Sequence, residues 1–363
     1  MMIVSKQQQI FIDFLRFSIG PKSEIPSSLK EADWKALYRI TQKQCLVGIL
    51  FDGIQRLPSS DVGISRDLLL QWMAQCKMLE KANLRLNDAA FRVSEWFRKK
   101  GFRTCILKGQ GNALMYPNPY SRTPGDIDIW VEGGDKRVIS FVRSISPHEK
   151  ACYHHIEFPS YKGVEVEVHY RPSFLLCFWN NRKLQKYYER VKEEQFSHRV
   201  MFSEQREVAI PTVEFNLIFQ LTHIFSHLMN EGIGLRQLLD YYFVLLHADI
   251  KNVVELQRNL KHIGLWKFAG AIMYIMHEVF GMPASRLIVP PNEKYGKFVL
   301  NEVLEAGNFG KHDKRNRFGK SQLGHNLQRV YRDIRLIKYF PAEALSEPIF
   351  RVWHFFWRMK NKK

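Results

Sequence analysis

The chain has 363 residues, of which 45% are hydrophobic and 25% charged, a balance that is typical of globular proteins and excludes a disordered or fibrous chain. Its 54 lysines and arginines outnumber its 36 aspartates and glutamates, so the formal net charge is +18. This excess favours a polyanionic partner, such as a phosphate-bearing small molecule, a nucleic acid or an anionic membrane surface, without choosing among them.

The five cysteines are odd in number and scattered, and no two of them form a CxxC pair. We therefore expect neither a disulfide framework nor a cysteine zinc site, and we expect a reducing, cytoplasmic location. The N-terminus lacks a basic segment followed by a long apolar one, so no signal peptide is expected. No window of about 18 apolar residues is free of charge, so no membrane span is expected either.

The first hundred residues are predicted to be helical. Ser28 and Glu31 have the spacing of a capping box ahead of an amphipathic segment. Further helices are predicted over residues 45–57 and 65–100, because their apolar residues recur with a period of 3.6. Gly101 is expected to end the long helix as the residue that follows its C-cap.

The pattern changes at Phe102, where a small unit of mixed strands and helices is predicted. Its elements are a strand at 103–107, a short helix at 112–116, a strand at 125–131, a helix at 135–144, and a hairpin of strands at 152–158 and 164–169. The strand GDIDIWV alternates strictly, which is typical of a strand with one apolar and one polar face.

The sequence is again predicted to be helical after residue 212, over residues 213–230, 235–248, 253–262 and 266–280. A basic stretch over residues 311–338 holds nine lysines and arginines against two aspartates. The aromatic run 349–357 is expected to pack on the helical domain, and the alternative is a helix that lies on a membrane surface.

These elements predict an α+β fold: a small mixed-sheet, palm-like core between two helical regions. The predicted regions are an N-terminal helical region (1–101), an α/β core (102–211) and a C-terminal helical domain (212–363).

Asp126 and Asp128 are the first candidates for chemistry. Two carboxylates at i and i+2 on a strand point to the same side, about 6.5–7 Å apart at the backbone. Such like charges repel, and one tends to protonate unless a cation neutralises them. Glu165, Glu167 and His169 share one face of the later strand and can supply a third carboxylate. Either strand alone also fits an ordinary solvated sheet face.

The combined pattern resembles the DNA polymerase beta-like nucleotidyltransferases, and within them a bacterial family of uncharacterised nucleotidyltransferases that has Lys-Gly in place of the usual Gly-Ser. The matching residues are Leu107-Lys108-Gly109, Tyr116-Pro117, Arg122, Gly125-Asp126-Ile127-Asp128-Ile129 and Glu167-Val168-His169-Tyr170-Arg171. The likeness covers about residues 30–310 and is strongest over 103–171.

The resemblance implies roles for these residues. Asp126, Asp128 and Glu167 would be catalytic and would bind two Mg²⁺ ions, or Mn²⁺. Lys108, Gly109 and Arg122 would bind the nucleotide, with Gly109 letting the backbone approach the phosphates. An acceptor pocket would include His169, Arg171, His223, Arg236 and Asp240. This chain departs from the family pattern in having Glu at the third acid position, where Glu165 is the alternative to Glu167, and in a longer gap between Gly109 and Asp126.

Three pairs of side chains have simpler interpretations. His223 and His227 are four apart on a helix but lack the Glu of an HExxH motif, so a core or substrate-pocket role is expected rather than zinc binding. His154 and His155 are predicted to point to opposite faces of a strand, and so not to chelate one metal ion. Arg236 and Asp240 are expected to form an i,i+4 pair.

The expected activity is therefore transfer of a nucleoside monophosphate from an NTP to an acceptor, with release of pyrophosphate. The alternative is a non-catalytic module of the same fold that binds nucleic acid or a protein partner. The basic stretch contains few aromatic residues for base stacking, which favours a small-molecule or protein acceptor over RNA. The sequence identifies neither the acceptor, nor the base, nor the oligomeric state.

Overall fold

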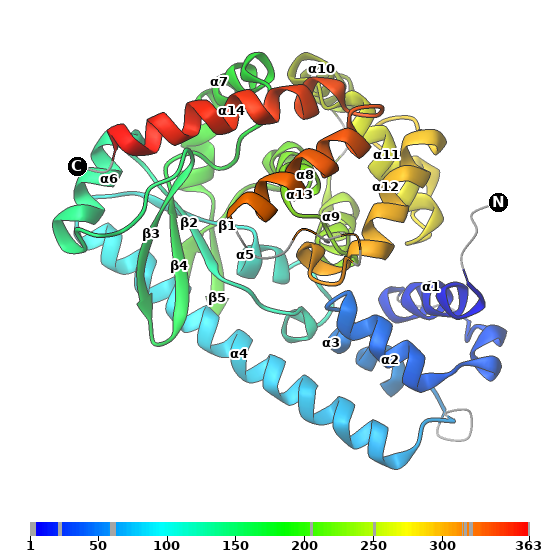
Figure 1. Cartoon of the computed structure of the whole chain (residues 1–363). Coiled ribbons are helices and arrows are strands. Elements are labelled where there is room, and N and C mark those ends of the chain that lie inside the picture. The colour runs from blue at the N-terminus through cyan, green and yellow to red at the C-terminus, as the bar shows by residue number, and fades with distance from the viewer. Residues whose placement is uncertain are drawn as a thin grey trace.

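The computed structural model describes residues 5–20, 24–58, 63–203, 206–249, 252–313, 315, 318 and 322–361. It has the predicted α+β architecture, with a small mixed sheet and helices on both sides of it in the sequence. Figure 1 shows the long helix α4 running past the sheet to the N-terminal helices, while the C-terminal helices cover the opposite side.

The N-terminal helices are α1 (Lys6–Ile19), α2 (Trp34–Lys43), α3 (Val47–Gln55) and α4 (Arg66–Lys99). The helix predicted over residues 65–100 is confirmed as α4. The Ser65 hydroxyl caps its N-terminus by accepting a hydrogen bond from the Leu68 N–H. Gly101 follows its C-cap with φ of +80°, a conformation that glycine adopts at little cost.

The predicted capping box at Ser28 and Glu31 is wrong. Residues Ser27–Glu31 form a short 3₁₀ helix, and the Ser28 hydroxyl donates to Asp13 instead. The cap of α2 is Asp33, whose carboxylate accepts hydrogen bonds from the N–H groups of Lys35 and Ala36. Asp33 directly precedes the amphipathic segment, so the nearer capping residue is the one used.

The four strands of the main sheet are β1 (Thr104–Leu107), β2 (Ile127–Val131), β3 (His155–Tyr161) and β4 (Val164–His169), in the order β1-β2-β4-β3. β2 pairs with β1 antiparallel and with β4 parallel, and β3 and β4 form the predicted hairpin. Two helices belong to this unit, α5 (Gly109–Ala113) and α6 (Gly134–Ile145). α5 begins three residues earlier than predicted, because Lys108 and Gly109 both have positive φ and turn the chain directly out of β1.

One face of this sheet is apolar and packs on helices. Ile127, Ile129 and Val131 of β2 form a hydrophobic cluster with Val93 of α4 and Val138 of α6, among others. Burying these side chains fixes the register, since a slip of one residue would turn the apolar set outward. The polar residues of the same strands are thereby directed to the other face.

The C-terminal region contains most of the larger hydrophobic core. Its helices are α8 (Val213–Asn230), α9 (Leu235–His247), α10 (Val253–Ile263), α11 (Trp266–Glu278), α12 (Glu293–Ala306), α13 (Gln322–Leu336) and α14 (Pro341–Lys360). The helix α7 (Phe178–Ser197) and the hairpin β5 (Arg199–Ser203) and β6 (Arg206–Ala209) precede them. The division into three regions at residues 101 and 211 stays a prediction.

The basic stretch 311–338 does not form a continuous cationic surface in its described part. Arg315 pairs with Asp313 and with Glu302 of α12, and Arg335 pairs with the same Glu302 at 3.2 Å. Arg332 is buried with only 5% of its surface exposed. Lys314, Arg317 and Lys320 lie outside the described residues.

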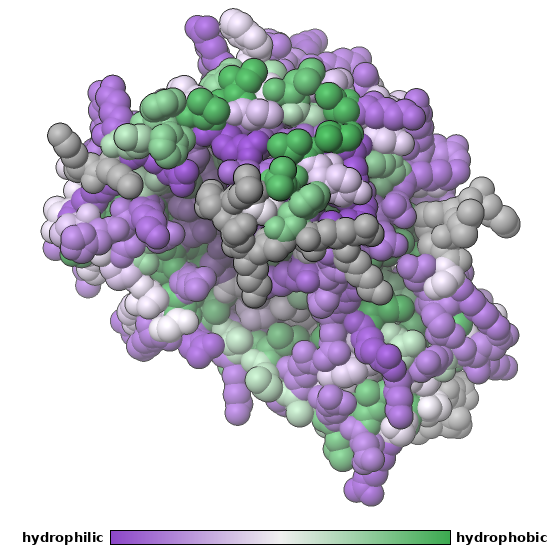
Figure 2. Space-filling view, in the orientation of Figure 1, coloured by the Kyte–Doolittle hydropathy of each residue, from purple (hydrophilic) through white to green (hydrophobic). Residues whose placement is uncertain are grey.

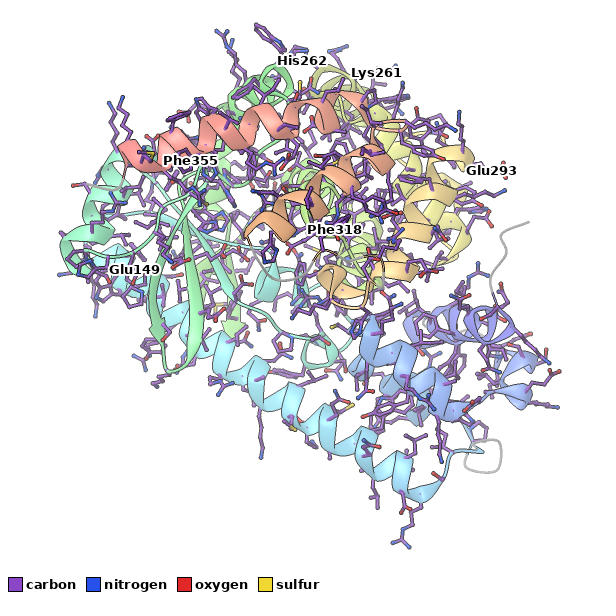
Figure 3. The ribbon with its side chains drawn as sticks, in the orientation of Figure 1. Glu149, Lys261, His262, Glu293, Phe318 and Phe355 are labelled. Carbon is purple, nitrogen blue, oxygen red and sulfur yellow. The ribbon has the colours of Figure 1, made fainter. Side chains whose placement is uncertain are left out.

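The aromatic run on α14 packs only in part. Phe350 stacks on Phe174, and its ring is also close to that of Tyr153, whereas Phe355 and Phe356 are 51% and 61% exposed. Figure 2 shows apolar side chains gathered on the surface over α14, and Figure 3 shows Phe355 on this helix. The expectation that the aromatic run packs on the helical domain is therefore wrong for Phe355 and Phe356. None of the described helices is long and apolar enough to cross a membrane.

Candidate functional site

A cavity of about 670 Å³ lies against the polar face of the sheet. Its other walls come from α8, α9, α13 and α14, so segments from the middle and the end of the chain meet there. Seven of the 13 histidines of the chain line it: His154, His155, His169, His223, His227, His325 and His354. The lining of this cavity is therefore rich in titratable side chains, unlike that of an incompletely packed hydrophobic core.

Three carboxylates meet on the sheet side of this cavity. Asp126 directly precedes β2, Asp128 lies within it, and Glu167 lies on the neighbouring parallel strand β4, in register with Asp128. One oxygen from each lies within 4.8 Å of the others. Glu165, on the same strand, is exposed and belongs to no such cluster among the described residues.

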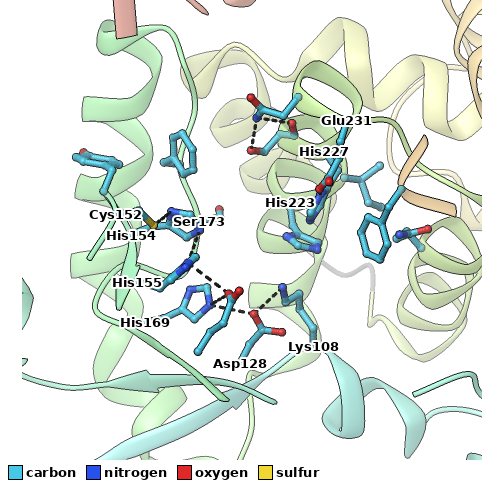
Figure 4. Close-up of a pocket in the computed structure, with 18 of the residues that line it drawn as sticks. Lys108, Asp128, Cys152, His154, His155, His169, Ser173, His223, His227 and Glu231 are labelled. Atoms are coloured by element: carbon cyan, nitrogen blue, oxygen red, sulfur yellow. Dashed lines mark hydrogen bonds and ion pairs between the residues drawn. The ribbon is translucent and has the colours of Figure 1, made fainter. Parts of the chain in front are cut away.

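The charge of Asp128 is balanced by two cations of the protein itself. Its Oδ1 atom accepts hydrogen bonds from Lys108 Nζ at 2.8 Å and from His169 Nε2 at 2.9 Å (Figure 4). Burial raises the pKa of Asp128, but Lys108 and His169 lower it more, so the carboxylate stays ionised. Burial lowers the pKa of His169, but its hydrogen bonds to Asp128 and Glu167 raise it to about 9, so the imidazole is charged at neutral pH.

Among the described residues, no cation donates a hydrogen bond to Asp126, although the nearby charge of Lys108 lowers its pKa. The charge of Asp128, and then burial, raise its pKa to about 6. The like-charge repulsion that the sequence predicted between the two aspartates is thus present. It raises the pKa of Asp126, whereas the two cations keep the pKa of Asp128 low.

Arg122 is held by a buried carboxylate. Its Nε and Nη2 atoms donate to Oδ1 and Oδ2 of Asp240 on α9, each at 2.8 Å, and the Tyr116 hydroxyl donates to the same Oδ1. The predicted Arg236–Asp240 pair is therefore wrong, since Asp240 pairs with Arg122 across 118 residues of sequence. A fork-to-fork pair of this kind fixes the orientation of both groups.

Arg236 is a buried cation that has no carboxylate partner among the described residues. Only 8% of its surface is exposed, its Nη1 donates to the carbonyl oxygen of Thr123 at 3.1 Å, and its Nε has no hydrogen-bond partner. Burial and the nearby charge of Arg122 lower its pKa. A Cβ on Gly125, the residue before Asp126, would lie 3.7 Å from Nη1, so the guanidinium lies beside the acid cluster.

The other predicted site residues divide between the cavity and its surroundings. His223 and His227 of α8 line the cavity, with ring centroids 4.2 Å apart. Arg171 does not: it donates to the Tyr153 carbonyl and pairs with Asp135 at the edge of a separate groove.

The expectation for His154 and His155 is wrong. β3 begins only at His155, so the two rings do not alternate across a strand, and His154 Nε2 lies 3.0 Å from His155 Nδ1. Burial lowers the pKa of His154 well below its usual value and that of His155 to about 4, so both rings are neutral at neutral pH.

Sequence reasoning missed Asn83, which positions the loop before β2. From α4, its Nδ2 donates to the carbonyl oxygens of Tyr120 at 3.0 Å and Arg122 at 2.9 Å. It also missed Arg329, Arg351 and Arg358, which α13 and α14 bring to the cavity wall. Nothing in the local sequence marks these residues, because their partners are distant in the chain.

Comparison with known proteins identifies the family. A model of the family described as uncharacterised nucleotidyltransferase matches residues 30–281, more than half of the chain. The chain belongs to this family. No curated protein matches the chain significantly. A solved structure, an antigenic nucleotidyltransferase-like protein from Paracoccidioides brasiliensis, is similar over 58% of this chain and 95% of its own, with 13% identity and a TM-score of 0.33. So distant a likeness supports no argument about the site.

In a nucleotidyltransferase of this family, the acid cluster is suited to a divalent cation. It offers three carboxylates, ligands that Mg²⁺ and Mn²⁺ prefer. The charge of Asp128 and burial raise the pKa of Asp126 more than the nearby charge of Lys108 lowers it, so the protein leaves this negative charge without full compensation. A cation at these oxygens would supply it, so the residues present fit the group.

The two aspartates of the GDID motif are expected to have opposite effects on stability in metal-free buffer. The raised pKa of Asp126 means that its stabilising contribution is complete below its usual pKa of 3.8 and is lost as the pH rises through about 6. Asp126→Asn should therefore raise the free energy of unfolding at pH 8 by about 1–3 kcal/mol and leave it nearly unchanged at pH 4. Denaturant unfolding with a chelator present measures this.

Asp128→Asn is the matched control. It leaves Lys108 and the His169 imidazolium without their shared acceptor, so it should destabilise the protein by about 3–5 kcal/mol at pH 8. Equal effects of the two substitutions would contradict the pairing of Lys108 and His169 with Asp128 rather than with Asp126.

Proposed function

We propose that this chain is a metal-dependent enzyme that transfers a nucleoside monophosphate from an NTP to an acceptor and releases pyrophosphate. The observation that supports this proposal best is the meeting of Asp126, Asp128 and Glu167 on two neighbouring parallel strands, at a cavity that also contains basic side chains. In the reaction, a nucleophilic atom of the acceptor attacks the α-phosphorus, and the bond from that phosphorus to the bridging oxygen of pyrophosphate breaks.

Asp126, Asp128 and Glu167 would hold the divalent cations, Mg²⁺ or Mn²⁺, expected for this chemistry. Bound there, the cations supply charge neutralisation on the phosphates and lower the pKa of the acceptor. Glu167 is preferred over Glu165 because it lies in the acid cluster and faces His169, whereas Glu165 is exposed. Lys108 and His169 keep the cluster ionised and compact without metal, so the carboxylates are already arranged.

Arg236 takes the role of triphosphate ligand that the sequence suggested for Arg122. The charge of Arg122 is already satisfied by Asp240, whereas Arg236 is buried beside Gly125 with an unused Nε donor. Arg122 and Asp240 then act as positioning residues for the loop that carries Asp126. Gly109 turns the chain at positive φ next to this loop, where a side chain would be strained.

The acceptor would lie between the acid cluster and α8, where His223 and His227 face the cavity. A small molecule or a protein side chain is favoured over RNA. The cavity is a limited space, and two arginines of the basic stretch, Arg315 and Arg335, are paired with acidic residues. A purely binding role explains the site less well, because three converging carboxylates would repel a polyanion.

Replacing Glu167 tests the catalytic assignment. Glu167→Gln should lower the rate of NTP-dependent transfer by more than about 100-fold. A residue that only hydrogen-bonds a metal ligand would cost about 10–100-fold when replaced, so the larger loss indicates a ligand. Glu165→Gln, two residues away on the same strand, is the matched control and should change it little. The assay is release of pyrophosphate from each NTP with Mg²⁺ or Mn²⁺ and pooled acceptors. Equal losses, or full activity of Glu167→Gln, would contradict the proposal.

Replacing Arg236 tests the triphosphate site. Arg236→Gln should weaken NTP binding by about 10–100-fold, since a hydrogen bond to a charged group contributes about 1.5–3 kcal/mol. It should not destabilise the fold much, because it removes a buried cation that has no carboxylate partner among the described residues. Titration calorimetry with NTP and thermal unfolding measure the two effects. Unchanged NTP affinity would remove Arg236 from the site.

The dependence of RNA affinity on salt concentration tests whether the acceptor is RNA. An RNA track with six or more phosphate contacts would lose roughly 10³ or more in affinity between about 50 and 200 mM salt. We expect a change of less than about tenfold, because Arg315 and Arg335 are paired and Arg332 is buried. Fluorescence anisotropy with labelled single-stranded RNA measures it. A steep loss would reverse the preference for a small or protein acceptor.

A further inference from the structure

A second set of metal-binding side chains lies on the wall of the same cavity, next to the acid cluster. Cys152, His154 and His155 can each offer one ligand atom such that the three atoms lie within 4.8 Å of one another. Figure 4 shows them on one wall, with the three residues ordered from Cys152 through His154 to His155, which approaches the carboxylates. This set contains no carboxylate, so its chemistry differs from that of the acid cluster.

The spacing of these atoms suits one metal ion. His154 Nδ1 lies 3.5 Å from Cys152 Sγ, and His154 Nε2 lies 3.0 Å from His155 Nδ1. Ligand atoms around a tetrahedral Zn²⁺ are about 3.3–3.6 Å apart, given Zn–N bonds of about 2.0–2.1 Å and Zn–S bonds of about 2.3 Å. One ligand atom from each residue lies within 4.8 Å of the other two, and His154 would bind the ion through one of its two nitrogens.

The types of ligand select the kind of metal. Thiolate and imidazole are soft or borderline ligands that favour Zn²⁺ and related transition metals over Mg²⁺. Two imidazoles and one thiolate leave a fourth position open, as in catalytic zinc sites. His155 Nδ1 is 3.3 Å from Glu167 Oε2 of the acid cluster, and the fourth ligand can come from a molecule in the cavity that both sets line.

We propose that Cys152, His154 and His155 bind one divalent transition-metal ion of the zinc class, separate from the cations expected at Asp126, Asp128 and Glu167. On binding, the Cys152 thiol releases its proton to solvent, and each imidazole binds as a neutral ring through one nitrogen. The open position faces the cavity, where it can bind a donor atom of the acceptor. The binding of the ion itself does not depend on the proposed transferase activity.

The test is zinc binding by the full-length chain, freed of metal with a chelator and titrated with Zn²⁺ in the presence of excess Mg²⁺. We expect one Zn²⁺ per chain, measured by competition with a chelating dye and by elemental analysis. Cys152→Ser should weaken this binding by at least about 100-fold. Cys76→Ser, a half-buried cysteine of α4 outside the cavity, is the matched control and should have no effect.

Asp126→Asn distinguishes the two metal sites, because it removes a ligand of the acid cluster and should leave Zn²⁺ binding intact. Loss of Zn²⁺ binding in Asp126→Asn, with retention in Cys152→Ser, would place the ion in the acid cluster and overturn the proposal. So would the absence of stoichiometric Zn²⁺ binding by the unmodified chain.

Alkylation of the unmodified chain gives a measurement that does not depend on the folding of a variant. Zn²⁺ should protect Cys152 from iodoacetamide, relative to Cys76, and Mg²⁺ should not, as followed by mass spectrometry. Equal alkylation of Cys152 with and without Zn²⁺ would overturn the proposal. Each result stands apart from the transferase assay, so failure of one proposal is distinguishable from failure of the other.

Discussion

The buried charge of Asp128 is the constraint on which the site depends. A carboxylate with 3% of its side chain exposed must be paired, and Lys108 and His169 supply the pairing from the ends of β1 and β4. The strand order β1-β2-β4 is what brings both cations beside it. The protein itself therefore holds the Asp128 carboxylate ionised and in place at the wall of the cavity.

A second buried pair determines where Asp126 lies. The loop between α5 and β2 is held by groups from outside it: Asn83 of α4 on one side and Asp240 of α9 on the other. The pairing of Arg122 with Asp240 joins the sheet unit to the C-terminal helices. The loop is thus held by one helix that precedes it in the sequence, α4, and by one that follows it, α9.

The sequence predicted the fold well where the signal is local. The alternation in GDIDIWV predicted which residues of β2 face the core, and Ser65 and Gly101 predicted the ends of α4, because period and capping are properties of neighbouring residues. It predicted the acid residues but not their partners. That Asp240 pairs with Arg122 rather than Arg236 depends on tertiary packing, as does the contact between His154 and His155, and neither leaves a trace in spacing along the chain.

The net charge of +18 also shows that the sequence does not tell which charged groups are paired in the folded protein. A count of cations describes the chain, but the partner of a protein meets only those that are exposed or that line a cavity. Arg122 and Arg315 are each paired with carboxylates, so they contribute little to the electrostatic field outside the protein.

Arg236, by contrast, is buried at the acid cluster without a carboxylate partner among the described residues. One uncompensated cation inside a cavity attracts a phosphate more strongly than several screened ones on the surface, because the surrounding protein is less polarisable than water. The position of each cation, and whether a carboxylate pairs with it, therefore decides how this chain meets an anion more than the number of its cations does.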